Sequence, residues 1–187
     1  MNYDLLELLD NQGFKEICNS EEKVLDFIHK IKHRDHCVLI FANEGIRDKI
    51  VNEFVNPKYA RNSISACFTH NESKYNCDHQ MTYDKLVKGQ KFQPEVISDF
   101  LVTVLENSYK KDSTRIACED TAWLAEGGFF EEHQKYGNSM DKRVLNDSAM
   151  ICCYNAEKIN EEQIKTITSN QKIIILEKPF SVYEKLI

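Results

Sequence analysis

Residues 37–42 read Cys-Val-Leu-Ile-Phe-Ala, an unbroken apolar run that is followed at once by Asn43-Glu44-Gly45. A run without alternating polar residues predicts a strand that is buried on both faces, as in a parallel sheet. The residues before it, 19–34, carry apolar side chains at helical spacing, and residues 46–55 after it predict another helix. The run is therefore the first strand of a helix–strand–helix pattern.

The same alternation continues along the rest of the chain. Further strands are predicted at 63–69, 115–118, 149–154 and 172–176, and further helices from Pro94 onward, at 129–144 and at 160–168. Buried strands alternating with helices predict an α/β fold with a largely parallel sheet flanked by helices on both faces. We expect residues 14–187 to form this single domain and residues 1–13 a helical extension. Asn19 and Glu22 have capping-box spacing, which predicts the start of the first long helix.

The charge composition excludes partners that need a cationic protein surface. The 187 residues include 24 Lys and Arg against 30 Asp and Glu, which gives a net charge of −6. A mildly acidic chain lacks the cationic footprint that nucleic acids and anionic membranes require, so we expect neither partner. The amphipathic stretch Tyr3–Asp10 offers instead a surface for a protein partner or a homodimer, or else packs on its own core.

Seven cysteines are many for a chain with no sign of secretion. The start, MNYDLLELLDNQ, has neither a basic beginning nor an apolar core, so it does not resemble a signal peptide. We expect a cytoplasmic protein with reduced thiols, most of them packed as small buried apolar groups.

The sequence contains neither of the glycine-rich loops that usually bind the phosphates of a nucleotide. Neither GxxxxGK[ST] nor GxGxxG occurs, and the first position where a phosphate loop could fall, Ile17–Glu22, has no glycine and two carboxylates. We therefore expect no NTP, although a nucleotide-binding enzyme with an altered loop stays an alternative.

Acidic residues follow the strand at 115–118. In parallel sheets, ligands bind outside the carboxyl ends of the strands, so Glu119, Asp120 and Trp123 are candidate ligand-binding residues, with Tyr154 nearby. Glu119 and Asp120 also resemble the acidic position that holds Mg²⁺ in nucleotide enzymes. Without a phosphate loop, strand-end acids that bind loop amides or line a pocket are the better interpretation. No catalytic residue is assigned.

Two thiols and two imidazoles gather between residues 67 and 79. Cys67, His70, Cys77 and His79 have the donor types of a tetrahedral zinc site, although the Cys-x-His spacing is tight for one ion. The alternative is an exposed loop that follows a buried Cys67. A metal- or thiol-based sensor is thus a second hypothesis, with zinc as its cofactor.

The stretch Arg115–Leu124, with Glu119 and Trp123 as a Glu-x-x-x-Trp motif, resembles the MEDS domain, the sensory domain of DcmR-type regulators of methanogens and methylotrophs. Residues 152–155, Cys-Cys-Tyr-Asn, resemble that family's Cys-x-Tyr-Asp strand end, and a family helix motif matches loosely at Tyr136, Met140 and Asp141. Three features depart from the family: Gly137 replaces a Glu, Ser169-Asn170 stands where a His-Pro is expected, and residues 32–35, Lys-His-Arg-Asp, replace a glycine-rich segment before the second strand.

The resemblance covers roughly residues 14 to 180. It implies a fold similar to KaiC and RecA ATPases that has lost the phosphate loop. It also implies a sensory or regulatory domain in signal transduction or transcription regulation, which binds a small ligand or a regulatory protein and is not an enzyme.

Overall fold

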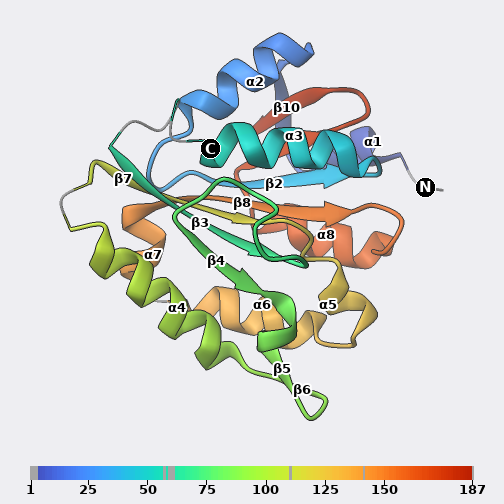
Figure 1. The fold of residues 1–187 in the computed structure, drawn as a ribbon. Helices are drawn as coiled ribbons and strands as arrows, with labels where there is room; N and C mark the ends of the chain where they lie inside the picture. The colour runs from blue at the N-terminus through green and yellow to red at the C-terminus, as the bar shows by residue number, and fades with distance from the viewer. Residues whose placement is uncertain (1–3, 57, 59–61, 110, 141, 187) are drawn as a thin grey trace.

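The computed structural model describes residues 4–56, 58, 62–109, 111–140 and 142–186, and its centre is a twisted sheet of eight strands in the order β1-β10-β9-β2-β8-β7-β3-β4 (Figure 1). The strands are β1 (Phe14–Cys18), β2 (His36–Phe41), β3 (Ser63–Thr69), β4 (His79–Thr82), β7 (Ser113–Cys118), β8 (Ser148–Asn155), β9 (Ile173–Leu176) and β10 (Ser181–Lys185). A separate two-stranded ribbon joins β5 (Val87–Lys88) to β6 (Lys91–Phe92).

Six neighbouring strands, from β9 to β4, run parallel. When β2, β3, β7, β8 and β9 are counted in chain order, their spatial order is 5-1-4-3-2. β10 is antiparallel to both β9 and β1, and it extends the sheet at that edge. The predicted fold class, a largely parallel α/β sheet of RecA-like type, is confirmed.

Helices cover both faces of the sheet (Figure 1). One face carries α2 (Glu21–Lys30) and α3 (Glu44–Val55). The other face carries α1 (Leu5–Asn11), α4 (Pro94–Asn107), α5 (Trp123–Glu126), α6 (Phe130–Ser139), α7 (Lys142–Asp147) and α8 (Glu161–Ser169), together with a 3₁₀ turn, η1 (Tyr83–Leu86).

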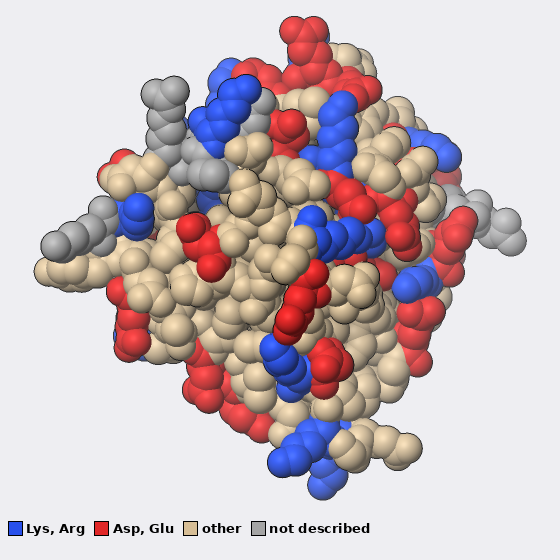
Figure 2. All heavy atoms as spheres, viewed as in Figure 1, with Lys and Arg blue, Asp and Glu red and all other residues tan. Residues whose placement is uncertain are grey.

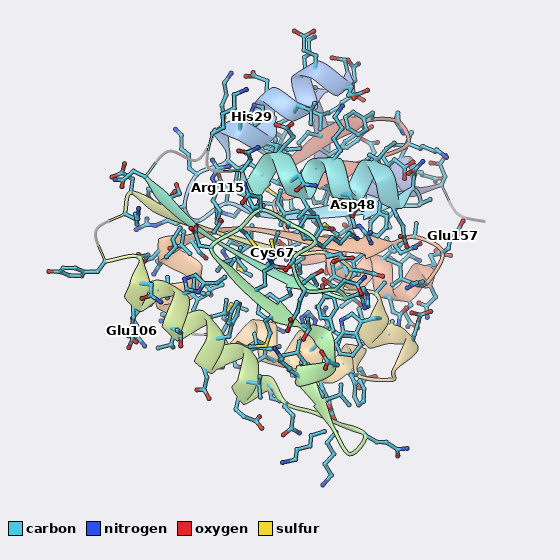
Figure 3. The ribbon with its side chains drawn as sticks, in the orientation of Figure 1. His29, Asp48, Cys67, Glu106, Arg115 and Glu157 are labelled. Atoms are coloured by element: carbon cyan, nitrogen blue, oxygen red, sulfur yellow. The ribbon has the colours of Figure 1, made fainter. Side chains whose placement is uncertain are left out.

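Alternate residues of the central strands supply the two cores. In β2, for example, Leu39 packs under α2 and α3, whereas Val38 and Ile40 pack on the opposite face. Arg115 of β7 is a buried exception, because its guanidinium donates to the backbone carbonyls of Phe54 at 3.0 Å, His29 at 3.0 Å and Ile31 at 3.2 Å. Figure 3 shows Arg115 beneath α2 and α3. Its hydrogen bonds connect the backbones of these two helices to the sheet.

Several sequence-based boundaries need correction. Helix α2 is capped by Ser20, whose hydroxyl accepts from the Lys23 amide, and not by Asn19, which bonds to Glu16. The predicted helix over 129–144 is two helices, α6 and α7. β1, β4 and β10 were not predicted, because each is short and carries polar residues that break the apolar pattern.

The N-terminal extension packs on the domain. Leu5 and Leu9 of α1 are buried in the core beside β2 and α8, whereas Leu6 is exposed. Tyr3, at the start of the predicted helix, and Asp141 of the family motif lie outside the described residues. In the part of the chain that the structure describes, no helix has both the length and the apolar character to cross a membrane.

Candidate functional site

The carboxyl edge of the parallel strands is lined by polar side chains that are nevertheless buried. These side chains are Thr69, Glu119, Asp120, Asn155 and Glu177. Each directly ends or follows a parallel strand, so the fold brings residues from distant parts of the sequence to one edge, as the strand-end rule predicts.

Glu119 is held by two cations. Its Oε1 lies 2.7 Å from Nζ of Lys74 and 3.6 Å from a guanidinium nitrogen of Arg47, which is itself only 1% exposed. Its Oε2 accepts from the Thr69 hydroxyl and from the His70 amide. A carboxylate with this many donors is already satisfied, and it functions as a structural anchor.

Both cations are shared with Asp48, which projects from α3 (Figure 3). Asp48 Oδ1 lies 2.8 Å from Arg47 Nε, 3.1 Å from Lys74 Nζ and 2.7 Å from the Tyr75 hydroxyl. Burial alone would raise the pKa of Asp48, but hydrogen bonds from Tyr75, Arg47 and Lys74 hold it below its ordinary value. The carboxylates thereby neutralise the cations that a phosphate group would need.

Asp120 faces the opposite way. Its Oδ2 lies 3.1 Å from Nζ of Lys158, its Oδ1 accepts from the Ala122 amide at 3.0 Å, and its own amide donates to the Tyr83 oxygen at 3.0 Å. Consecutive residues of an extended segment project to opposite sides, so Glu119 and Asp120 do not form a joint carboxylate site.

The turn between β2 and α3 is occupied by a side chain of this protein. Glu177 Oε2 accepts from the amides of Ala42 at 2.5 Å and Asn43 at 2.7 Å, while the Asn43 side chain caps α3 by accepting from the Gly45 amide. In a nucleotide-binding α/β domain, free amides after the first parallel strand would receive phosphate. The sequence-based choice of Ile17–Glu22 for this loop was wrong, because those residues end edge strand β1 and open α2.

A cavity of about 740 Å³ lies on the other face of the sheet, beneath α4, α5 and α6. Its walls include Tyr83, Trp123, His133, Tyr136 and Tyr154. The rings of Tyr83 and Trp123 lie 5.2 Å apart, and both are in the apolar core cluster of this face. A concave, mainly apolar space with a few polar groups is typical of a small-molecule site.

Four side chains of this cavity have a polar atom without a hydrogen-bond partner among the described residues. The atoms are His36 Nε2, Thr121 Oγ1, Trp123 Nε1 and His133 Nδ1. Burial lowers the pKa of His133 to about 4, so its imidazole is neutral at pH 7. Buried polar groups are normally paired, and a concentration of unpaired ones around one cavity marks a place prepared for further contacts.

The predicted ligand-binding residues divide between the two regions. Trp123 and Tyr154 line the cavity, whereas Glu119 and Asp120 belong to the ion-paired carboxyl edge. The Glu-x-x-x-Trp motif therefore spans the strand end and supplies one residue to each region. Sequence reasoning missed Tyr83 and His133, because η1 and α6 carry no pattern that places them over the centre of the sheet.

The predicted zinc ligands are not brought together. The Cys77 thiol donates to the backbone carbonyl of His79 at 3.2 Å, not to a shared ion site with the His79 ring. The His70 ring instead packs on Tyr83, with 4.8 Å between ring centroids. Within the described ranges, no three His, Cys, Asp or Glu side chains are grouped so that they could hold a metal ion. The reason is that Cys67 points into the α3 core, whereas His70 lies beyond the strand end.

Surface charges are mixed on the face shown in Figure 2, where acidic and basic side chains lie next to each other. Ion pairs such as Lys49 with Glu21 and Lys85 with Glu72 account for part of this arrangement. Exposed pairs of this kind contribute little to stability.

Comparisons with known proteins add little. No protein-family model matches the chain, and no curated protein matches it. Among solved structures, the chain is similar to the cytoplasmic domain of EssC, with 11% sequence identity and a TM-score of 0.44. The similarity covers 75% of this chain and 31% of that one.

Proposed function

We propose that this chain is a regulatory domain that binds a small ligand in the cavity beneath α6 and signals through protein contacts. The observation that carries the proposal is the cavity itself, in which apolar walls surround polar atoms without partners. The resemblance to the MEDS sensory domain supports the same function. The signal is the presence of the ligand, and the receiver is a regulatory protein.

Helix α6 is the part of the molecule best placed to respond. None of its residues is fully buried, although it covers one side of the cavity. A helix held by few buried contacts is easily displaced, and a ligand beneath it would add the apolar contacts it lacks. Ligand binding would therefore order α6 and change the surface that it presents to a partner.

The nucleotide alternative is weakened by the carboxyl edge. Glu177 holds the two amides of the β2–α3 turn, and Arg47 and Lys74 are paired with carboxylates. A phosphate would have to displace these carboxylates from the amides and cations, and it would be repelled by their negative charge. The proposed function therefore does not involve nucleotide hydrolysis.

Trp123 gives a direct test, because it is the only tryptophan of the chain and lines the cavity. A library of neutral aromatic and alicyclic compounds, including indole-free probes such as toluene and quinoline, is screened by Trp fluorescence and thermal shift. We expect binders to change the emission and raise the melting temperature, since a ligand of the native state stabilises it.

The matched variants are Leu101→Phe and Leu186→Phe. Leu101 lines the cavity from α4, so the larger ring would occupy the site, whereas Leu186 is exposed near the C-terminus. We expect binders to lose affinity for Leu101→Phe only. Equal binding by both variants and the original protein would place the site elsewhere, and a screen without binders would reject the proposed function.

A further inference from the structure

Two of the seven cysteines face the cavity together. Cys118 ends β7 and Cys152 lies on β8, and the two residues are register partners on neighbouring parallel strands. Both line the cavity and keep partial exposure, although their strands lie in the middle of the sheet. Cys37, Cys67 and Cys153 are at most 2% exposed on the opposite face. Cys18 and Cys77 are also partly exposed, but Cys18 ends the edge strand β1 and Cys77 lies in the segment before β4, so Cys118 and Cys152 are the partly exposed thiols that lie side by side in the cavity.

The strand geometry keeps these two thiols from pairing as a disulfide. Register partners on neighbouring strands are separated by the strand spacing of about 4.8 Å, and their side chains leave the sheet in parallel. A disulfide needs Cβ atoms roughly 3.5–4.5 Å apart and side chains that converge. The pair therefore remains as two neighbouring free thiols. Metal binds to thiolates and not to thiols, so both sulfurs would lose their protons when an ion enters the site.

The surroundings select for a soft ion. Met150 lies two residues before Cys152 and points to the same face, and Met140 lines the same cavity. Neither Glu119 nor Asp120 lines the cavity, and both are held by ion pairs, so neither supplies an oxygen to a hard cation beside the two thiols. Thiolates and thioethers favour monovalent copper, which is stable with only two sulfur ligands, whereas structural zinc sites take four ligands.

We propose that the cavity contains a copper(I) site in which the ion bridges Sγ of Cys118 and Sγ of Cys152. Metal–thiolate bonds of roughly 2.3 Å would hold the sulfurs up to about 4.6 Å apart, close to the strand spacing. Binding converts two thiols and Cu⁺ into a bis-thiolate complex of charge −1 and releases two protons, with no change of oxidation state. The N–H of Trp123, which has no partner among the described residues, lines the same cavity and offers a donor near the extra negative charge.

The site does not depend on the organic ligand of the proposed function, although it shares the same cavity. The full chain, reduced and handled without oxygen, is titrated with Cu(I) in competition with bicinchoninate. We expect one tightly bound Cu(I) per chain and a thiolate-to-copper absorption band in the ultraviolet. The Cys118→Ser/Cys152→Ser variant should lose affinity by more than the roughly 100-fold that changes outside the ligand shell reach.

The matched control is Cys67→Ser/Cys77→Ser, which removes two thiols from the opposite face of the sheet. We expect it to bind Cu(I) like the original protein. A second measurement, on the unmodified sequence, maps the thiols that bound Cu(I) protects from N-ethylmaleimide, and we expect protection of Cys118 and Cys152. Equal copper binding by the two double variants, or protection elsewhere, would overturn the site. If the organic binders still act through Trp123, only the copper inference fails.

Discussion

His133 gives the sharpest prediction, because its environment should make stability depend on pH. His133 is half-buried on α6, with its Nδ1 shielded from solvent, and desolvation lowers the pKa of its imidazole from 6.5 to about 4. Below pH 6.5 the unfolded chain takes up a proton that the folded chain does not. The free energy of unfolding therefore falls as the pH drops from 6.5 toward 4.

The magnitude follows from the two pKa values. A pH of 5 lies 1.5 units below the pKa of 6.5 that the imidazole has in the unfolded chain, and each unit corresponds to about 1.36 kcal/mol. His133 therefore lowers the free energy of unfolding by about 2 kcal/mol at pH 5 and by almost nothing at pH 7.5. Urea denaturation of the original protein and of His133→Leu at both pH values isolates the effect. We expect the original protein to lose about 2 kcal/mol more than the variant.

A control variant on the same helix, Asn138→Ala, changes an exposed residue and no titratable group. It should keep the full pH dependence of the original protein. If His133→Leu shows the same loss as Asn138→Ala, the imidazole is protonated in the folded state, and desolvation does not hold it neutral.

Three further changes test the fold around the site by urea denaturation. Glu177→Ala removes the acceptor of the Ala42 and Asn43 amides, and we expect a loss of about 1.5–3 kcal/mol, because two part-buried amides lose a charged acceptor; a loss below about 1 kcal/mol would mean that water replaces the carboxylate. Arg115→Met leaves three backbone carbonyls without their donor, and we expect at least about 3 kcal/mol of destabilisation. Gly137→Ala should instead stabilise by about 0.5–1 kcal/mol, because a Cβ at this helical position meets nothing within 4 Å; destabilisation would show that α6 needs the glycine.

The central strands could be predicted from sequence because burial on both faces leaves an unmistakable apolar run. Residues 37–42 and 149–154 correspond closely to β2 and β8, and 63–69 matches β3. Edge strands leave a weaker trace. In β1, four of five residues keep exposure, so the segment Phe14–Cys18 has no continuous apolar run. Its position beside β10 depends on pairing between residues about 170 apart, which local pattern cannot reveal.

The site was predictable only where it lies at strand ends. Topology alone brings Glu119 and Asp120 to the carboxyl edge, and the sequence shows both. Their partners could not be read in the same way, because Lys74 comes from an irregular loop and Lys158 from a turn after β8. The cavity depends on how α6 covers the sheet. None of the residues of α6 is fully buried, so the helix has no apolar face from which its packing could be predicted.

The carboxyl edge and the cavity differ in whether their buried polar atoms already have hydrogen-bond partners. At the carboxyl edge, Glu119 and Asp120 are paired with cations, and one oxygen of Glu177 is fixed by two amides while the other lacks a hydrogen-bond partner. A ligand arriving there would have to break existing interactions before it made new ones. In the cavity, Trp123 and His133 have nitrogens with no partner among the described residues, so a ligand that moves them only slightly can gain contacts at little cost. The occupied amides of the β2–α3 turn and the unpartnered polar atoms of the cavity therefore favour the same conclusion: a ligand would gain more contacts in the cavity than at the carboxyl edge.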